Sequence, residues 1–375
     1  MTLPIVAVAG TPGEMGAAYG ERAAELVGGN LQVYARRFRD ASGLDETDVR
    51  RAGAGFRAVT REHLPRIAEM LDGVAAGAGA DPYDIYALNA RTELIYGTRN
   101  SPPGECTSLA VLGSHTETGD VLLAQNWDWH HEQVPYTLLL ATADERGRRV
   151  LTLAEAGMLA KTGVNDAGLG VCLNMLACDR DGQPGGVPYH VLLRAVMESG
   201  TLAAALTTAH RHPRSASMNL LLAYCGEAID VELVPGDAGV IHPRDGMITH
   251  ANHLETPLPV RDATREWGGS TLYRAQRARH LLAGTVAGRR ATVDDVEAVL
   301  RDHFGHPAAI CRHVDPEEPD YYLRSQTIAS VMIEPAKGRM AVSAGPPCIA
   351  PYQVVALDQV MALESVPAPL ARRTS

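Results

Sequence analysis

The chain has 375 residues, of which 46% are hydrophobic, 21% are charged and 5% are aromatic. This balance is typical of a globular protein with an aliphatic core, and the length allows one large domain or two ordinary ones. The formal net charge of −10 argues against the basic surface that proteins use to bind nucleic acid, so no nucleic-acid partner is expected.

The N-terminal run from Met1 to Ala9 is apolar, but it is short and has no basic leader, so a signal peptide is not expected. No run of about 18 apolar residues is present, and no membrane-spanning helix is predicted. The six cysteines are scattered and form no CxxC pair, which is typical of free thiols in a reducing compartment. We therefore expect a cytoplasmic protein.

Residues 1–105 are predicted to be mostly helical, beginning with a capped, proline-started helix at Thr11-Pro12. The helical spacing covers Met15–Leu26, Leu31–Val59, His63–Ala76 and Asp81–Tyr96. The segment Gly97–Glu105 contains two prolines and a glycine and indicates an exposed break.

After Cys106 the pattern changes to short β-like runs separated by turns. The predicted strands are Thr107–Leu112, Val121–Asn126, Tyr136–Ala141, Val150–Ala154, Gly168–Leu173, Asn219–Tyr224, Ala228–Val234, Met247–His250, Thr327–Glu334 and Arg339–Ser343. The predicted helices are Pro188–Glu198, Thr201–His210, Ser270–Leu282 and Thr292–Phe304. Runs of strands followed by helix pairs favour sheets covered by helical layers.

Cys106 follows the break and precedes a strand. On burial habits alone, such a cysteine is more typical of packing than of chemistry. Several other motifs occur in order around it: Leu88-Asn89-Ala90-Arg91-Thr92-Glu93, Asn126-Trp127-Asp128, Glu155-Ala156-Gly157, Gly163-Val164-Asn165-Asp166, Gly170-Val171-Cys172-Leu173-Asn174, Gly186-Val187-Pro188, Thr249-His250-Ala251-Asn252 and Ile310-Cys311-Arg312. This ordered set, which spans nearly the whole chain, resembles the isopenicillin-N acyltransferase family of N-terminal-nucleophile hydrolases.

The resemblance implies an α+β fold, a four-layer αββα sandwich with a helical N-terminal pro-segment. It also implies that the precursor cuts itself between Glu105 and Cys106. The products would be a pro-segment of residues 1–105, which stays bound as a partner, and a catalytic domain of residues 106–375.

By the same resemblance, Cys106 is the nucleophile, Asp128 lies in the hydrogen-bond network of the new amino group, and Asn252 is an oxyanion donor. Asn174 and Arg312 are candidate substrate-binding residues. Each also has an ordinary structural interpretation, as a turn, strand-end or ion-pair residue.

The implied chemistry is physically reasonable. A free cysteine has a pKa near 8.5, so only a few per cent is thiolate at neutral pH. If Cys106 is the first residue of a mature chain, its own α-amine, with a pKa of about 7.7–8.0, can take the thiol proton. The same thiol would attack the Glu105 carbonyl during maturation.

Two positions depart from the penicillin-acylating relatives: Ala309 stands where a serine is expected, and Glu105 where a glycine is expected. These departures argue against β-lactam substrates more than against the fold. Arg91 and Glu93 are candidates for positioning the precursor loop or for an internal salt bridge.

Metal and nucleotide sites are not predicted. The pairs His130-His131 and His303/His306 lack the spacing of a zinc motif, and no P-loop or Gly-x-Gly-x-x-Gly occurs. No cofactor is expected, although a coenzyme A thioester is a candidate co-substrate.

The predicted function is a cysteine amidohydrolase or acyltransferase that acts through a Cys106 thioester on small N-acyl amino compounds or peptide-like amides. The alternatives are a coenzyme A-dependent N-acyltransferase of a secondary metabolite, an uncut Cys–His enzyme, and an unprocessed binding protein of the same fold.

Overall fold

Two β-sheets form the centre of the protein, and the computed structural model describes residues 2–96, 106–321 and 324–364 of the chain. The first sheet, in spatial order, contains β1 (Ile5–Gly10), β4 (Thr137–Asp144), β5 (Arg149–Glu155), β6 (Thr162–Asn165), β7 (Gly170–Met175), β8 (Met218–Tyr224), β9 (Glu227–Val234) and β10 (Asp237–Ile241). The second contains β11 (Met247–His250), β2 (Cys106–Val111), β3 (Leu122–His130), β12 (Ser325–Glu334), β13 (Arg339–Ser343) and β14 (Tyr352–Ala356).

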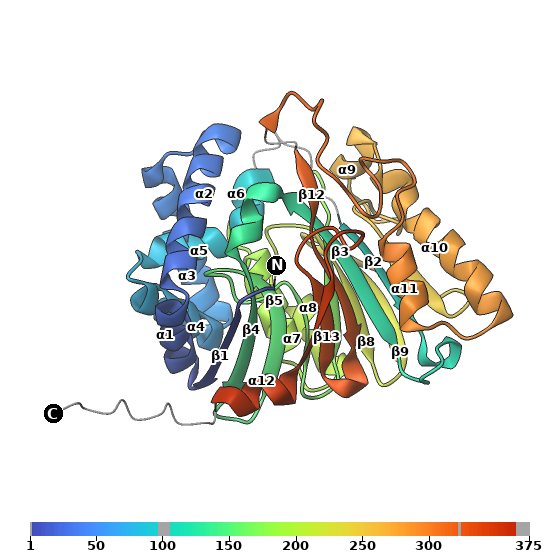
Figure 1. Ribbon diagram of the computed structural model, residues 1–375. Coiled ribbons are helices and arrows are strands. Elements are labelled where there is room, and N and C mark those ends of the chain that lie inside the picture. The colour runs from blue at the N-terminus through green and yellow to red at the C-terminus, as the bar shows by residue number, and fades with distance from the viewer. Residues whose placement is uncertain (1, 97–105, 322–323, 365–375) are drawn as a thin grey trace.

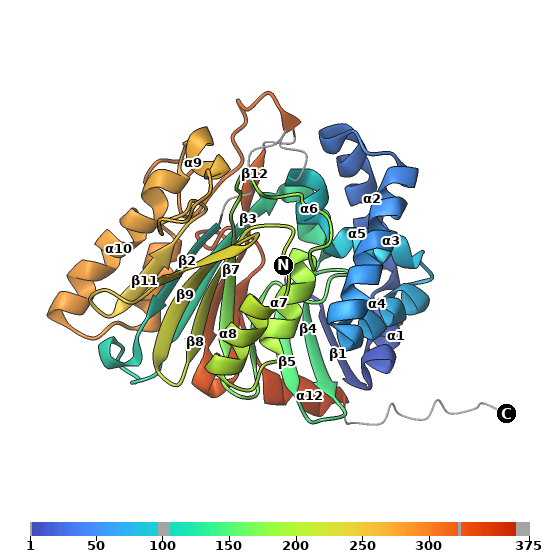
Figure 2. The ribbon, with the colours of Figure 1, turned by 180° about the vertical axis from the view of Figure 1, so that it is seen from behind.

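Helices cover the outer faces of both sheets (Figures 1 and 2). On the side of the first sheet lie α1 (Pro12–Arg22), α2 (Ala24–Ser42), α3 (Glu46–His63), α4 (Pro65–Ala78), α5 (Pro82–Asn89), α6 (Arg91–Tyr96), α7 (Tyr189–Met197) and α8 (Leu202–Arg211). On the side of the second sheet lie α9 (Ala263–Trp267), α10 (Thr271–Gly288) and α11 (Val293–Leu300). The last helix, α12 (Leu357–Glu364), contacts β1, β4 and β14.

The apolar core has a layer at each interface, which explains why the sheets stack. One cluster joins the first sheet to α1, α4 and α7, a second fills the space between the two sheets, and a third joins the second sheet to α10 and α11. Inner strands such as β2, β3 and β5 are buried along most of their length because both of their faces are covered. The predicted four-layer αββα fold is confirmed. No helix among the described residues is both long and apolar enough to span a bilayer.

Local signals in the sequence explain several boundaries. Thr11 accepts from the backbone N–H of Glu14, whose carboxylate accepts in return from the backbone N–H of Thr11, and this capping box starts α1. The helical pattern predicted for Leu31–Val59 is divided in two. Gly43, at φ 69°, ends α2, and Asp45 caps α3.

The N-terminal segment differs from the prediction at one end. Ile5–Gly10 is a strand that pairs in parallel with β4 and forms the edge of the first sheet. A six-residue apolar run carries no clear periodicity by itself, so its conformation depends on the sheet edge that receives it. Residues 1–105 therefore contribute a strand as well as helices to the body of the protein.

Helices α1 and α4 pack so closely that their backbones are nearly in contact. A Cβ atom added at Gly16 would lie 2.0 Å from the Met70 carbonyl oxygen, and one added at Gly77 would lie 2.0 Å from the Ala17 oxygen. Glycine is required at this crossing because any side chain would push the two backbones apart.

We predict that Gly16→Ala lowers the free energy of unfolding by about 1–3 kcal/mol, through overpacking of this crossing. Gly13→Ala in the same helix is the matched control, because a Cβ there meets no atom within 4 Å. It should leave stability unchanged or raise it by up to about 1 kcal/mol. Urea unfolding in a Cys106→Ala background, which prevents the expected cleavage, makes the comparison. An equal loss of stability in the two variants would contradict the conclusion that Gly16 is required for the close packing of α1 on α4.

Candidate active site

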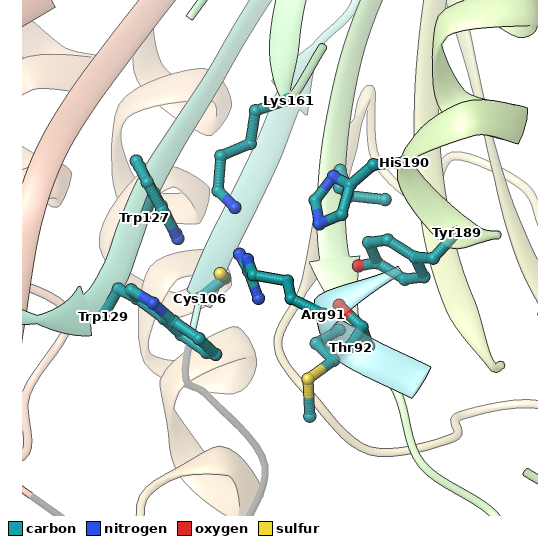
Figure 3. Close-up of a pocket in the computed structure, with 10 residues that line it drawn as sticks. Arg91, Thr92, Cys106, Trp127, Trp129, Lys161, Tyr189 and His190 are labelled. Carbon is teal, nitrogen blue, oxygen red and sulfur yellow. The ribbon is translucent and has the colours of Figure 1, made fainter. Parts of the chain in front are cut away.

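Cys106 is the first residue of β2 and lies opposite Trp127 on β3. Its side chain faces a small pocket whose empty volume, with the opening to solvent included, is about 290 Å³. Figure 3 shows the residues around the thiol, which come from both sheets and from α6 and α7. The lining consists of Arg91, Thr92, Cys106, Trp127, Trp129, Lys161, Leu173, Met175, Tyr189 and His190.

The main chain of Cys106 is held on both sides. Its backbone N–H donates to Oδ1 of Asn252 at 2.7 Å, and its carbonyl oxygen accepts from the guanidinium of Arg274. Arg274 also donates to Asn252 Oδ1 at 2.8 Å and to Thr107 Oγ1 at 2.7 Å. Cys106 is thus fixed on both sides of its Cα atom, by a buried amide and by a buried cation.

Asn252 is itself rigidly placed, since its backbone N–H donates to Thr271 Oγ1 at 2.9 Å and its Nδ2 donates to the Met175 carbonyl at 2.9 Å. Sequence analysis predicted Asn252 as an oxyanion donor. The structure places its Oδ1 against the backbone nitrogen of Cys106. An amide nitrogen carries two hydrogens, so the bond to Met175 does not exhaust Nδ2 as a donor. The oxyanion role stays a prediction.

Arg274 was missed by the sequence analysis. Its guanidinium is fully buried, and the residue belongs to the buried stripe of α10, which includes Thr271, Ala278 and Leu282. An arginine on the apolar face of an amphipathic helix is the signal that could have identified it, because a buried charge needs several acceptors. Here the acceptors are the backbone and side chains around Cys106.

Asp128 is fully buried on β3. Its Oδ1 accepts from Thr327 Oγ1 at 2.6 Å across the strand pair with β12, and its Oδ2 lies 3.9 Å from Nε of Arg312. Burial raises the pKa of the Asp128 carboxyl to about 7, although the charge of Arg274 and the bond from Thr327 oppose the rise. The carboxyl therefore titrates near neutral pH and is poised to exchange a proton.

The thiol of Cys106 is protonated at neutral pH in the uncut chain. Burial raises its pKa to about 11, and the charge of Asp128 adds to the rise, while Lys161, the backbone N–H of Asp128 and Arg274 lower it. Because the thiolate is the nucleophile, the thiol needs a neighbouring base before it can attack a carbonyl.

A buried charge cluster forms one wall of the pocket. Glu155 pairs with Arg91 at 2.7 Å and with Lys161 at 3.2 Å, and it accepts from Tyr34 at 2.5 Å. The Lys161 ammonium lies 3.8 Å from the centre of the Trp127 ring. Burial lowers the pKa of Lys161 to about 7, and the charge of Arg91 adds to the decrease.

Arg91 and Glu93 both come from the segment before Cys106, and they bind different partners. The salt bridge of Arg91 is with Glu155, while Glu93 accepts from the backbone N–H of Tyr189 at 2.6 Å. Arg91 and Thr92 line the pocket that Cys106 faces. Residues that precede Cys106 in the chain are therefore part of the site itself.

The two candidate substrate-binding residues lie at the edge of this arrangement and do not line the pocket. Asn174 Nδ2 donates to Ser108 Oγ at 2.8 Å, and its Oδ1 accepts from Gln125 at 2.9 Å, so it links the two sheets. Arg312 donates to Ser270 Oγ at 3.0 Å, and burial lowers its pKa to about 10. Both contacts are consistent with structural roles, and substrate binding stays a prediction. Glu105, on the other side of the expected cut, lies outside the described residues.

We predict that Arg274→Met destabilises the chain by about 3 kcal/mol or more, because it leaves buried acceptors without their donor. Arg277→Met on the same helix is the control, since Arg277 pairs with Asp302 at 2.7 Å nearer the surface and should cost about 1 kcal/mol or less. Urea unfolding in the Cys106→Ala background measures both. A loss at Arg277 as large as that at Arg274 would refute the anchoring role.

Comparison with known proteins gives a family. The model of the family described as "Acyl-coenzyme A:6-aminopenicillanic acid acyl-transferase" matches residues 115–348. A curated relative is the 40 kDa form of acyl-coenzyme A:6-aminopenicillanic-acid-acyltransferase from Emericella nidulans. It is 24% identical over an alignment of 313 residues that covers 81% of this chain and 83% of that protein.

Among solved structures, penicillin V acylase from Agrobacterium tumefaciens is similar with 17% identity and a TM-score of 0.44, over 64% of this chain and 83% of that one. A variant of conjugated bile acid hydrolase from Clostridium perfringens is similar with 13% identity and a TM-score of 0.47, over 68% of this chain and 94% of that one. The family match spans more than half of the chain and includes Asp128, Asn252 and Arg274. The protein is therefore an enzyme that belongs to the acyl-coenzyme A:6-aminopenicillanic acid acyl-transferase family.

Proposed function

We propose that the chain is a precursor that cuts itself before Cys106, and that the mature enzyme transfers acyl groups through a thioester on that cysteine. The observation that carries the proposal is the position of Cys106. It begins β2, its backbone nitrogen is held by Asn252 at 2.7 Å, and its thiol faces the pocket. A cut before this residue would turn the held nitrogen into an amine beside the thiol.

The maturation step requires only groups of the chain and water. The Cys106 sulfur attacks the Glu105 carbonyl carbon, the peptide C–N bond breaks, and the nitrogen takes up the thiol proton. Water then hydrolyses the resulting thioester, which leaves a carboxylate on Glu105 and a free thiol and amine on Cys106. The hold of Arg274 on the Cys106 carbonyl would keep Cys106 itself in place during the exchange.

In the mature enzyme the α-amine of Cys106 would serve as the general base. Its ordinary pKa of about 7.7–8.0 is well matched to work near neutral pH. The thiolate attacks the substrate carbonyl, the amine of the substrate leaves with a proton from the α-ammonium, and water or an acceptor amine attacks the thioester. Asn252 Oδ1 would orient the amine, and Asp128 would bias the charge around it.

The lining of the pocket supports a small N-acyl amino compound or peptide-like amide as the substrate. Trp127, Tyr189 and Met175 offer apolar surface for an acyl group. Arg91 brings a cation and Lys161 an amine with a pKa of about 7, and both contact the single carboxylate of Glu155. The small volume favours a short acyl chain. Because Arg91 and Thr92 belong to residues 1–105, the cut pro-segment would stay bound and complete the pocket.

A second candidate is transfer of an acyl group from a coenzyme A thioester to an amine. The description of the matched family and the name of the curated relative favour it. Both candidates pass through the same thioester, and they differ in the donor that forms it and the acceptor that resolves it. Amide hydrolysis needs only water as the acceptor, whereas transfer must exclude water from the site.

We predict that the purified wild-type protein consists of two fragments, with the masses of residues 1–105 and 106–375. The larger fragment should begin at Cys106. Cys106→Ala should remain a single 375-residue chain. The control is Cys225→Ser, an exposed thiol whose replacement should not affect cleavage. Intact-mass spectrometry with N-terminal sequencing gives the answer. An active preparation that contains only full-length chain would contradict self-cleavage and favour an uncut Cys–His enzyme.

A further inference from the structure

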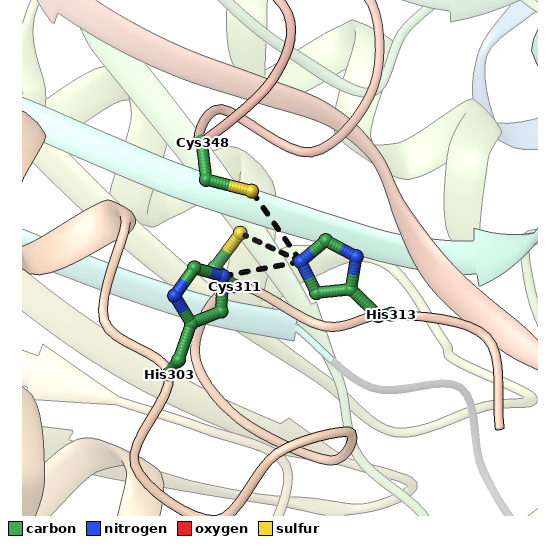
Figure 4. Close-up of side chains that lie close together, drawn as sticks. All are labelled: His303, Cys311, His313 and Cys348. Carbon is green, nitrogen blue, oxygen red and sulfur yellow. Dashed lines mark hydrogen bonds between the residues drawn. The ribbon is translucent and has the colours of Figure 1, made fainter.

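Four side chains converge on one point beyond the end of α11, away from the Cys106 pocket. They are His303, Cys311, His313 and Cys348, and their Nε2 and Sγ atoms all lie within 4.8 Å of one another (Figure 4). The first three lie on the segment after α11, and Cys348 lies in the loop between β13 and β14. Their ring nitrogens and sulfurs point toward one another.

Hydrogen bonding alone does not account for this convergence. Three atoms lie close to Nε2 of His313: Nε2 of His303 at 3.1 Å, Sγ of Cys348 at 3.4 Å and Sγ of Cys311 at 3.7 Å. An imidazole nitrogen has a single in-plane site, which either donates one proton or accepts one. It therefore satisfies one of these neighbours well, and the other two approach for a different reason.

Three of the six separations, all measured from Nε2 of His313, match the edges of a tetrahedron of metal ligands. With Zn–N of about 2.0–2.1 Å and Zn–S of about 2.3 Å, tetrahedral geometry places two nitrogens about 3.3 Å apart and a nitrogen and a sulfur about 3.6 Å apart. The observed N–N distance is 3.1 Å and the two N–S distances are 3.4 and 3.7 Å.

The backbone around the cluster is held in place by its own bonds. The N–H of Cys311 donates to the Asp302 carbonyl at 3.0 Å, and the N–H of His313 donates to the Pro307 carbonyl at 3.0 Å. Nε of Arg301 donates to the Pro347 carbonyl at 2.9 Å and so ties the loop of Cys348 to the end of α11.

We propose that His303, Cys311, His313 and Cys348 form a structural zinc site of the Cys₂His₂ type. Four protein ligands close the coordination shell, which is the arrangement of a structural and not a catalytic zinc. Two thiolates with two imidazoles suit zinc better than the hard cations Mg²⁺ and Ca²⁺, which require oxygen ligands. Binding releases the protons of both thiols to solvent. No metal site was expected from the sequence, and the proposed zinc site differs from that expectation.

The site would also position part of the Cys106 network. Arg312 lies between two of the ligands, and its guanidinium contacts Ser270 and approaches Asp128. A zinc ion bound on both sides of Arg312 would fix its main chain. The metal content does not depend on the chemistry of Cys106, so the site can be tested whether or not the proposed function holds.

The test is the metal content of the whole chain. Wild-type protein purified in reducing buffer, or reloaded with zinc and passed through a desalting column, should hold about one zinc ion per chain. Cobalt-loaded protein should show the visible absorption of a tetrahedral thiolate site. Loss of a residue that only supports a ligand already costs about 10–100-fold in metal affinity. Cys311→Ser, Cys348→Ser and His313→Ala, which each remove a ligand, should therefore lower the zinc affinity by roughly tenfold or more.

Two controls keep these results interpretable. Cys225→Ser removes an exposed thiol and should keep the zinc, and so should His306→Ala, whose ring lies 5.4 Å from that of His313 but whose nitrogens are not among the four ligand atoms. The measurements on the wild-type protein need no variant, so they test the proposal even if a ligand variant fails to fold. A wild-type chain with four free ligands and no zinc after loading would overturn the proposal, as would a disulfide between Cys311 and Cys348 in freshly purified protein.

Discussion

The hold of Asn252 and Arg274 on the main chain of Cys106 is the interaction on which the rest of the site depends. It joins the first residue of β2 to the loop after β11 and to α10. Asn252 lies 146 residues beyond Cys106 in the chain, and Arg274 lies 168 residues beyond it. The αββα layers make this possible, because α10 packs on the second sheet beside β2 and β11. Arg274 is a fully buried cation, and burial is tolerable only because Cys106, Thr107 and Asn252 supply acceptors. The cation and the strand end therefore stabilise each other.

The same burial controls the ionisation of the site. It raises the pKa of the Cys106 thiol to about 11 and of Asp128 to about 7, and it lowers the pKa of Lys161 to about 7. A thiol held protonated is a weak nucleophile, so during the proposed maturation it would pass its proton to a neighbour with a pKa near 7, Asp128 or Lys161. Under the proposed function, the α-amine freed by the cut then becomes the base for turnover. Both fragments would then contribute to the pocket. Arg91 precedes the expected cut in the sequence and Lys161 follows it, and both pair with Glu155.

The sequence predicted the architecture well because the periodicity is local. Strands near Cys106, Asp128 and Asn219 and helices near Pro188 and Thr271 could be inferred from runs and caps. The strand at Ile5–Gly10 could not, since its conformation depends on pairing with β4, whose partner residues lie 134 positions further along the chain. Cys106, Asp128 and Asn252 were identified through an ordered resemblance, and the structure brings Cys106 and Asn252 into direct contact.

Residues that act through distant partners escaped prediction. Arg274 and Lys161 carry no local motif, and their importance comes from what the fold brings against them. Cys348 lies 35 residues beyond His313 in the chain, so no spacing pattern links it to the other three ligands of the proposed zinc site. Conversely, Asn174 and Arg312 were predicted to bind substrate. Their side chains contact other residues of the protein: Ser108, Gln125, Ser270, Ser325 and Asp128. The contacts of these residues with distant parts of the chain, and not their local sequence, therefore determine what they do.

The central claim is that Cys106 carries the acyl group. Acid-quenched mass spectrometry of the enzyme during turnover, with a panel of N-acyl amino acids and acyl-coenzyme A thioesters, tests it directly. We expect the mass of one acyl group on fragment 106–375, mapped to the Cys106 sulfur and removed by neutral hydroxylamine. Turnover by Cys106→Ala at the wild-type rate, or an acyl group located on another residue, would contradict the account.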